Sequence, residues 1–246
     1  MADIRHYSRP PITEAVIELR FEGHLSGREL ERVRDRFKPR YSTIEQLQLL
    51  EVVIGERGAL TPKLMNAGYK MTDKNALDIL MVKTNTFGTI RLAPYENWET
   101  LRGTAAENWE LFEKVLNTRK RVLRIGARFI NRIDIPTDLL AATGIAEMFP
   151  THIRLGPGIA SETGQFSYRV QALHAGTSAK LTIQSAVLEQ PALLENTSIS
   201  LDTDAYFDLE IPQRIDEMWA MADKLREAKN DVFENSISDH LRAFFK

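Results

Sequence analysis

Apolar and polar residues alternate with a period of two in several parts of the chain, which is the pattern of β-strands that bury one face. The first such stretch, 12–21, follows Pro10 and Pro11 and places Ala15, Ile17 and Leu19 on one side. Comparable stretches predict further strands at 69–72, 76–83, 86–92, 121–135, 166–173, 179–188 and 198–209. The chain is therefore expected to contain a large amount of sheet.

Four segments instead place apolar residues three or four positions apart, which predicts amphipathic helices. These segments are 26–37, 95–116, 137–149 and 215–245. The first begins with Ser26 and has Glu29 three residues later, which is the spacing of a capping box. Residues 42–66 fit no single pattern, because 51–54 is compatible with a strand or with the end of a helix that begins near residue 43.

The order of these elements predicts an α+β fold. In the first half a strand, a helix, a group of strands, a helix and a strand follow one another, as in the split β-α-β arrangement of ferredoxin-like domains. The second half repeats this order loosely and ends, over 215–245, in a long helix or a pair of helices. We therefore expect two ferredoxin-like units with antiparallel sheets, related by duplication, over residues 1–120 and 121–246.

The strand at 121–135 carries the most distinctive side chains in the chain. Arg124, Arg128 and Arg132 fall on one face, whereas Phe129 and Asn131 fall on the apolar face. A row of arginines on a sheet either binds an anion, such as phosphate or carboxylate, or pairs with acidic residues of a neighbouring strand. The three arginines and Asn131 are thus candidate ligand-binding or partner-binding residues.

The first strand offers matching acidic residues. Glu14, Glu18 and Glu22 recur every four residues, as the arginines do. In a split β-α-β unit the first and last strands are antiparallel neighbours, so these glutamates are candidate structural ion-pair partners of the arginines. We favour this structural ladder over the anion site, because each ion pair formed weakens the binding of an anion.

Composition excludes several kinds of chemistry. The sequence has 32 basic and 34 acidic residues and a formal net charge of −2, which argues against a generally basic nucleic-acid binder. It has no cysteine, so disulfides, thiolate metal sites and cysteine nucleophiles are excluded. No run approaches the roughly 18 apolar residues of a membrane helix, and the first residues do not resemble a signal peptide. The expected location is the cytoplasm, with no membrane association and no cofactor.

Motifs for catalysis are weak. The histidines show no metal-ligand spacing, and the glycine-rich segment at 156–158 lacks a phosphate-binding pattern. Asp202 and Asp204 share one face of a predicted strand and are weak candidates for holding a divalent metal. We favour a solvated strand face for this pair, since Leu201, Thr203 and Ala205 alternate with it and no third acidic residue is placed by a motif.

Several motifs together resemble a family of uncharacterised proteins of similar length that is distributed sporadically among bacteria and archaea. They are 10–14 (PPITE), 95–98 (YENW), 124–133 (RIGARFINRI), 201–204 (LDTD) and 230–240 (NDVFENSISDH). The resemblance covers nearly the whole chain, and the arginine strand is its most specific part. The family supplies no catalytic residues. Its patchy distribution implies accessory gene content, such as defence or toxin–antitoxin systems.

Three functions therefore remain. The leading hypothesis is a non-enzymatic protein that works through protein–protein contacts, with another protein or with itself as a homodimer, in an accessory or defence-type system. The second is an RNA- or nucleotide-binding ferredoxin-like module that uses Arg124, Arg128, Arg132 and Asn131. The third is a metal-dependent enzyme that uses Asp202 and Asp204.

Overall fold

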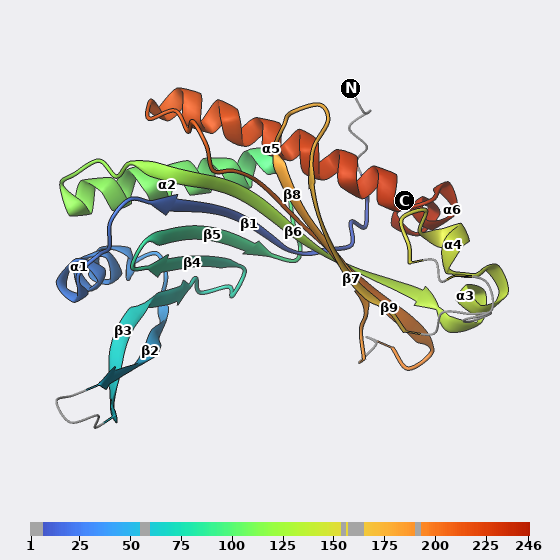
Figure 1. Cartoon of the computed structure of the whole chain (residues 1–246), viewed down its shortest axis with the longest axis horizontal. Helices are drawn as coiled ribbons and strands as arrows, with labels where there is room; N and C mark the ends of the chain where they lie inside the picture. The colour runs from blue at the N-terminus through green and yellow to red at the C-terminus, as the bar shows by residue number, and fades with distance from the viewer. Residues whose placement is uncertain (1–6, 55–59, 154–155, 157–164, 190–192) are drawn as a thin grey trace.

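All strands in the described part of the chain belong to one antiparallel sheet of nine strands (Figure 1). The computed structural model describes all residues except 1–6, 55–59, 154–155, 157–164 and 190–192. The strand order is β2-β3-β4-β5-β1-β6-β9-β8-β7. The strands are β1 (Ile12–Phe21), β2 (Thr43–Ile54), β3 (Leu60–Thr72), β4 (Asp78–Lys83), β5 (Thr86–Leu92), β6 (Val122–Pro136), β7 (Ser167–Leu173), β8 (Lys180–Val187) and β9 (Asn196–Phe207).

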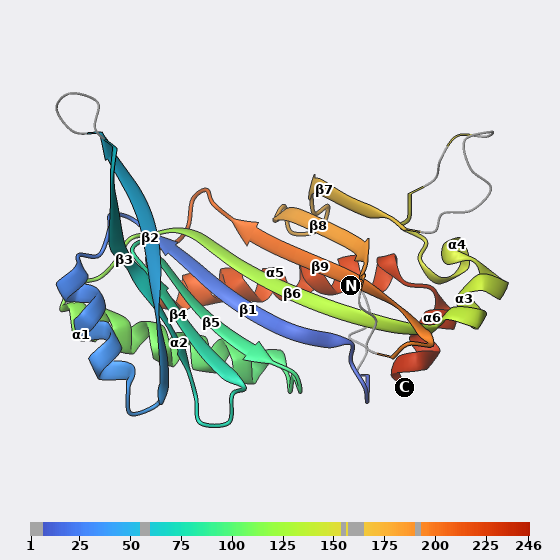
Figure 2. The ribbon, with the colours of Figure 1, turned by 90° about the horizontal axis from the view of Figure 1, so that it is seen from below.

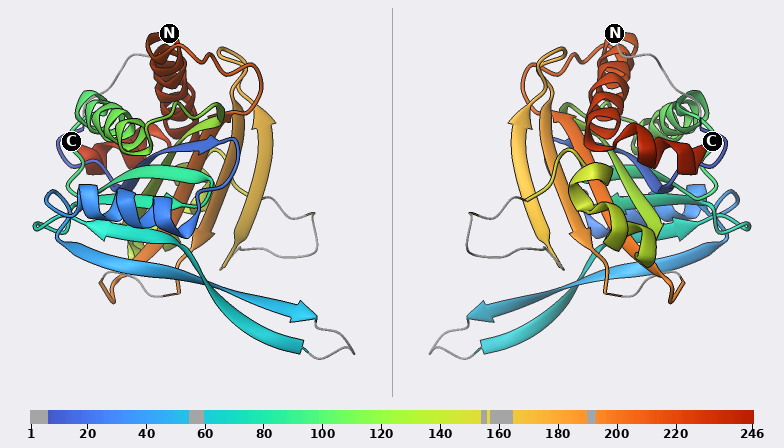
Figure 3. Two further views of the ribbon diagram at one scale, coloured as in Figure 1. Left: turned by 90° about the vertical axis from the view of Figure 1, so that its left-hand side faces the viewer. Right: turned by 90° about the vertical axis from the view of Figure 1, so that its right-hand side faces the viewer.

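Three helices cover one face of this sheet (Figures 1 and 3). Helix α5 (Ile215–Ser236) packs over β6 and β9, and α2 (Trp98–Leu116) packs over β5 and β1. Helix α1 (Gly27–Phe37) lies beside α2 and contacts β3. Figure 2 views the opposite face, over which no helix lies in the described residues. No helix in the described part of the chain is long and apolar enough to span a membrane.

The period of two decides which side chains enter the main core. Ala15, Ile17 and Leu19 of β1 point toward the helices and are at most 2% exposed. Beneath α2, the rings of Phe87, Phe112 and Trp109 pack with centroids 4.7–5.5 Å apart. Burial of each large apolar side chain contributes about 1.5–3 kcal/mol, so this packing fixes the orientation of every central strand. The alternate residues of β1, β6 and β9 must then lie on the face without helices.

A second, smaller core lies at the C-terminal end of β6 and the N-terminal end of β9. Short helices supply it: α3 (Thr137–Thr143), α4 (Ile145–Met148), α6 (Asp239–Arg242) and the 3₁₀ turn η1 (Ala243–Phe245). Its buried residues are Ile133, Ile135, Met148, Phe149, Ile199, Ile237, Leu241 and Phe245. This core anchors the C-terminal segment against the sheet.

The structure confirms the mixed α and β class and the antiparallel pairing, and it corrects the predicted architecture. The expectation of two separate sheets is wrong, because β6 pairs with β1 on one side and with β9 on the other. The sheet therefore continues across the boundary predicted between residues 120 and 121. The structure shows no duplicated ferredoxin-like unit in the part of the chain that it describes.

Local predictions had different outcomes. The capping box is confirmed, since Ser26 Oγ accepts from the N–H of Glu29 and the Glu29 carboxylate accepts from the N–H of Ser26. The helix considered for residues 43–54 is wrong, because this segment is β2. Of the two alternatives for 215–245, the pair of helices is confirmed, because the chain is extended at Ile237 and Ser238 caps a new short helix.

Candidate functional site

The face of the sheet without helices carries a cluster of charged side chains at its centre. β1 contributes Glu18, β6 contributes Arg124 and Arg128, and β9 contributes Asp202 and Asp204. We call these five residues the charged face. All five fall there because their neighbours in sequence are the apolar residues packed beneath α2 and α5.

Arg124 is the most enclosed member of the charged face, with 12% of its side chain exposed. Its Nη1 donates to Glu18 Oε1 at 3.1 Å, and its Nη2 donates to Asp204 Oδ2 at 2.6 Å. The guanidinium also lies 4.3 Å from the centre of the Tyr206 ring, within range of a cation–π interaction. It passes over Gly126, where a Cβ atom would stand only 2.6 Å from Nη1. Glycine at this position lets the arginine lie flat on the sheet.

Arg128 makes a two-pronged contact with Asp202. Its Nε donates to Oδ1 at 2.9 Å and its Nη2 donates to Oδ2 at 2.5 Å, which is the paired geometry preferred between guanidinium and carboxylate groups. The hydrogen bond to Asp202 raises the pKa of Arg128. Burial raises the pKa of Asp204, although Arg124 acts in the opposite direction and Glu18 adds to the rise.

Arg132, the third predicted arginine, lies toward the second core. Its Nε donates to Asp134 Oδ1 at 3.2 Å and its Nη2 donates to Ser198 Oγ at 3.2 Å. Asn131 points to the opposite side of the strand, is 3% exposed, and its Nδ2 donates to the carbonyl of Leu201 at 3.1 Å. The structure therefore separates Asn131 from the three arginines, because adjacent residues of a strand face opposite sides.

The three glutamates predicted as ion-pair partners occupy different positions from those that the spacing suggested. The register places Val16 opposite Arg128 and Gly126 opposite Glu18, so Glu18 reaches Arg124 along a diagonal. Glu22 instead lies 3.8 Å from Arg121 in an exposed pair. Arg128 pairs with Asp202 of β9, and the predicted partner on β1 was Glu14.

Two aspartates of β9 replace most of the glutamates as partners, and sequence reasoning missed this role for them. Asp202 and Asp204 share the arginine face, whereas Leu201, Thr203 and Ala205 are buried on the other. No group of three or more histidine, aspartate or glutamate residues is arranged to hold a metal ion in the described residues. Arg124 and Arg128 already donate to carboxylates, so their charge is partly neutralised and an added anion is attracted less strongly.

At the edge of the sheet formed by β2, two strands extend beyond their neighbours. Residues 48–54 of β2 and 60–66 of β3 pair with each other, whereas β4 pairs only with the later part of β3. We call this two-stranded extension the arm, and it projects away from the rest of the sheet (Figures 2 and 3). Leu49 is paired with Met65 and Leu50 with Leu64, so each pair lies on its own face of the arm. These side chains are 60%, 42%, 59% and 63% exposed, respectively.

The backbone conformation and side-chain contacts at the root of the arm fix its position. A register shift falls between Leu47 and Gln48, and on the facing strand Gly68 has φ +141°. A Cβ at Gly68 would come within 2.1 Å of the Val82 carbonyl oxygen. Asn66 Oδ1 accepts from the N–H of Gly68 at 3.0 Å, and Asn66 Nδ2 donates to the Tyr69 hydroxyl at 3.0 Å. The direction in which the arm leaves the sheet is thus held by specific contacts.

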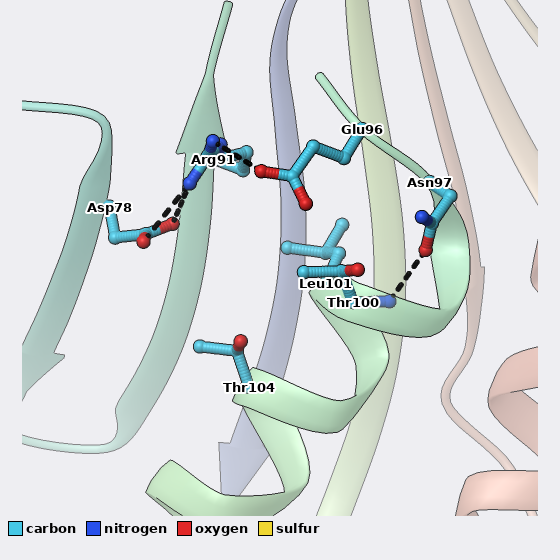
Figure 4. Close-up of a pocket in the computed structure, with 7 residues that line it drawn as sticks. All are labelled: Asp78, Arg91, Glu96, Asn97, Thr100, Leu101 and Thr104. Carbon is cyan, nitrogen blue, oxygen red and sulfur yellow. Dashed lines mark hydrogen bonds and ion pairs between the residues drawn. The ribbon is translucent and has the colours of Figure 1, made fainter. Parts of the chain in front are cut away.

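A small hollow beside the start of α2 is too small to be a binding site (Figure 4). Its volume is about 10 Å³, which is room for no more than a single water molecule. Arg91 crosses it, donating to both oxygens of Asp78 at 3.1–3.2 Å and to Glu96 at 2.9 Å, while Asn97 caps the helix. These contacts hold β4 and β5 to the start of α2.

The signal for the arm was present in the sequence. Leu49 and Leu50 are adjacent, as are Leu64 and Met65, and adjacent residues of a strand face opposite sides. Two such apolar pairs in facing strands require both faces of the hairpin to be apolar. A scan of protein families finds no match for this chain, and a search of curated proteins finds none either.

Proposed function

We propose that this protein is non-enzymatic and acts through protein–protein contacts made by the apolar arm. The observation that carries the proposal is the exposure of Leu49 and Met65 on one face of the arm and of Leu50 and Leu64 on the other. A strand pair that packs against its own domain buries one face, whereas this pair buries neither.

Physical chemistry explains why such an arm needs a partner. An isolated two-stranded hairpin is at best marginally stable in water, because its conformational entropy is not offset by burial of apolar surface. Burial of each exposed leucine in a partner would contribute roughly 1–2 kcal/mol. The bulge and the contacts of Asn66 and Gly68 hold the arm in one direction, which lowers the entropic cost of binding.

The charged face supports the same proposal indirectly. Arg124 and Arg128 are engaged by carboxylates on their own sheet, which partly neutralises their charge and weakens their attraction for a phosphate or a nucleic acid. The resemblance to a sporadically distributed prokaryotic family extends the proposal to a role in an accessory or defence-type system.

The test compares two double variants. Leu50→Ser with Leu64→Ser removes one apolar face of the arm, whereas Leu194→Ser with Leu209→Ser removes two leucines that are 99% and 71% exposed outside the arm. Because all four side chains are exposed, both variants are expected to keep their free energy of unfolding within about 0.5 kcal/mol of the unmodified protein. Tagged proteins are incubated in native lysate, and bound proteins are identified by mass spectrometry.

The expected result is a partner that is retained by the unmodified protein and by the control and is lost from the arm variant. The proposal fails if the purified protein stays a strict monomer and captures nothing from native lysate. It also fails if the arm variant retains the same partners as the control.

A further inference from the structure

Strand β7 forms the other end of the sheet, opposite to the arm (Figures 2 and 3). In the described residues it pairs only with β8, and six of its seven residues are exposed. Helix α5 packs over β9 and β6, which are two and three strands away from β7 in the sheet. Val170 is 46% exposed although it points to the same side as the helices. Within the described residues β7 is therefore an open edge, and most of its side chains are exposed, whereas Tyr168 is partly covered and its hydroxyl donates to the Thr151 carbonyl at 3.2 Å.

The hydrogen bonds at its ends show which backbone groups face outward. The Phe166 carbonyl accepts from Val187, and the N–H of His174 donates to Ala179, so these even-numbered residues bond toward β8. Backbone groups of alternate residues in a strand point the same way. The residues whose N–H and C=O groups point to the open edge are Ser167, Arg169, Gln171 and Leu173.

Contacts of the β7–β8 turn hold β7 in place, and its residue types permit pairing with another strand. His174 Nε2 lies 3.1 Å from Asp231 of α5, and the N–H of Thr177 donates to His174 Nδ1 at 3.1 Å. These contacts tie the β7–β8 turn to the helix, so the strand is ordered before any partner arrives. Arg169 is the only charged residue in β7, and the strand contains no proline. The usual devices that protect an edge from pairing are therefore weak here.

We infer that β7 pairs with β7 of a second copy of this chain, antiparallel and across a two-fold axis at Val170. In this register Ser167 lies opposite Leu173 of the other copy and Arg169 lies opposite Gln171. Every outward-facing N–H and C=O group of the strand then finds a partner. The two sheets join into one.

The side chains favour a second copy over a foreign strand. Val170 meets its own equivalent, and Tyr168 meets Ala172, so the apolar side chains on the helix side form one patch across the axis. Arg169 faces a neutral glutamine, and no two like charges lie opposite each other. An isologous interface needs this self-complementarity, because the same residues must serve as both halves.

The surface area buried between the two β7 strands determines how stable the dimer is. A strand of seven residues is about 23 Å long, so the edge alone buries well below the roughly 800 Å² per partner of a standard stable interface. The dimer is consequently a weak one that forms at high protein concentration, and a covalent trap is the suitable probe.

The sequence has no cysteine, so a single introduced cysteine can form a disulfide only with the same residue of a second copy. Val170→Cys places two thiols opposite each other in a pair whose Cα atoms are about 4.5 Å apart, within the range of a disulfide. Ala172→Cys is the matched control on the same strand and face, because its two copies would lie about 13 Å apart along the strands. Under mild oxidation Val170→Cys is expected to give at least about tenfold more crosslinked dimer than Ala172→Cys.

A mixing experiment tests the register itself. Tyr168→Cys mixed with Ala172→Cys is expected to give a mixed disulfide, whereas each alone gives none. The inference is overturned if Val170→Cys crosslinks no more than Ala172→Cys, which would also be the outcome if the edge accepts only a foreign strand. The arm variants keep the Val170→Cys crosslink, so a failure here is separable from a failure of the proposed function.

Discussion

Lys229 is expected to make the free energy of unfolding of this protein depend on pH. It lies on α5, and its Nζ stands 3.8 Å from the centre of the Phe129 ring of β6. Burial lowers the pKa of Lys229 from 10.5 to about 7, the nearby charge of Arg226 adds to this effect, and Glu234 opposes it. An amine in this position is costly to keep protonated.

The sign of the pH dependence follows from this lowered pKa. Below pH 7 both the folded and the unfolded chain carry the proton, and the folded protein bears the full cost of the buried charge. Between pH 7 and 10.5 the unfolded chain binds more protons, so the free energy of unfolding rises with pH. The pKa change from 10.5 to about 7 corresponds to at most about 5 kcal/mol. Because water reaches part of the side chain, we expect about 2–3 kcal/mol.

The assay is urea unfolding between pH 6 and 9.5 of the unmodified protein and two variants. Lys229→Met keeps an unbranched side chain on Phe129 and removes the charge. It is expected to be about 2–3 kcal/mol more stable than the unmodified protein at pH 6, with a difference that shrinks toward pH 9.5. Lys224→Met, at an exposed position of the same helix, should change stability by less than about 0.5 kcal/mol. A difference between Lys229→Met and the unmodified protein that does not vary with pH would refute this reasoning.

Two further substitutions test the charged face and the root of the arm. Arg124→Ala leaves Glu18 and Asp204 without their shared cation and should cost about 2 kcal/mol of unfolding free energy at pH 7. The cost should fall as the pH is lowered, because burial raises the pKa of Asp204 and a protonated Asp204 no longer needs the cation. Arg121→Ala, which breaks an exposed pair, should cost under about 0.5 kcal/mol, and equal losses for the two would contradict the structure. Gly68→Ala should cost at least about 2 kcal/mol in thermal or urea unfolding, because its Cβ would meet the Val82 carbonyl. Gly103→Ala, in a helix with open space around it, should instead stabilise the protein by about 0.5–1 kcal/mol, and the opposite order would be inconsistent with these backbone conformations.

The features that could be predicted from the sequence are those that depend on residues close together in the chain. The capping box at Ser26 and the apolar side of β1 follow from local spacing, and the structure has both. The antiparallel contact of β1 with β6 was also expected from element order. The partner of each arginine could not be predicted, because a spacing of four in both strands fits several registers equally well. The choice depends on Asp202 and Asp204, which lie more than 70 residues further along the chain.

The single continuous sheet was missed for a related reason. A strand that ends one unit and a strand that begins the next look alike in sequence, and β6 serves both halves at once. Its alternation carries no information on how many neighbours it has. In 42–66, apolar residues on both sides of β2 and β3 removed the period of two on which the prediction of strands relied.

The distribution of helices gives the two proposed contact regions a common cause. Helices α1, α2 and α5 cover the middle of the sheet and leave the arm at one end and β7 at the other. The middle of the uncovered face carries its own ion pairs, whereas both ends expose apolar side chains and strand edges that have no partner strand among the described residues. Six strands, about 4.8 Å apart, separate the arm from β7, so a partner on the arm would not obstruct a second copy at β7. The two contacts should therefore form independently, and a dimer through β7 would present two arms to its partner.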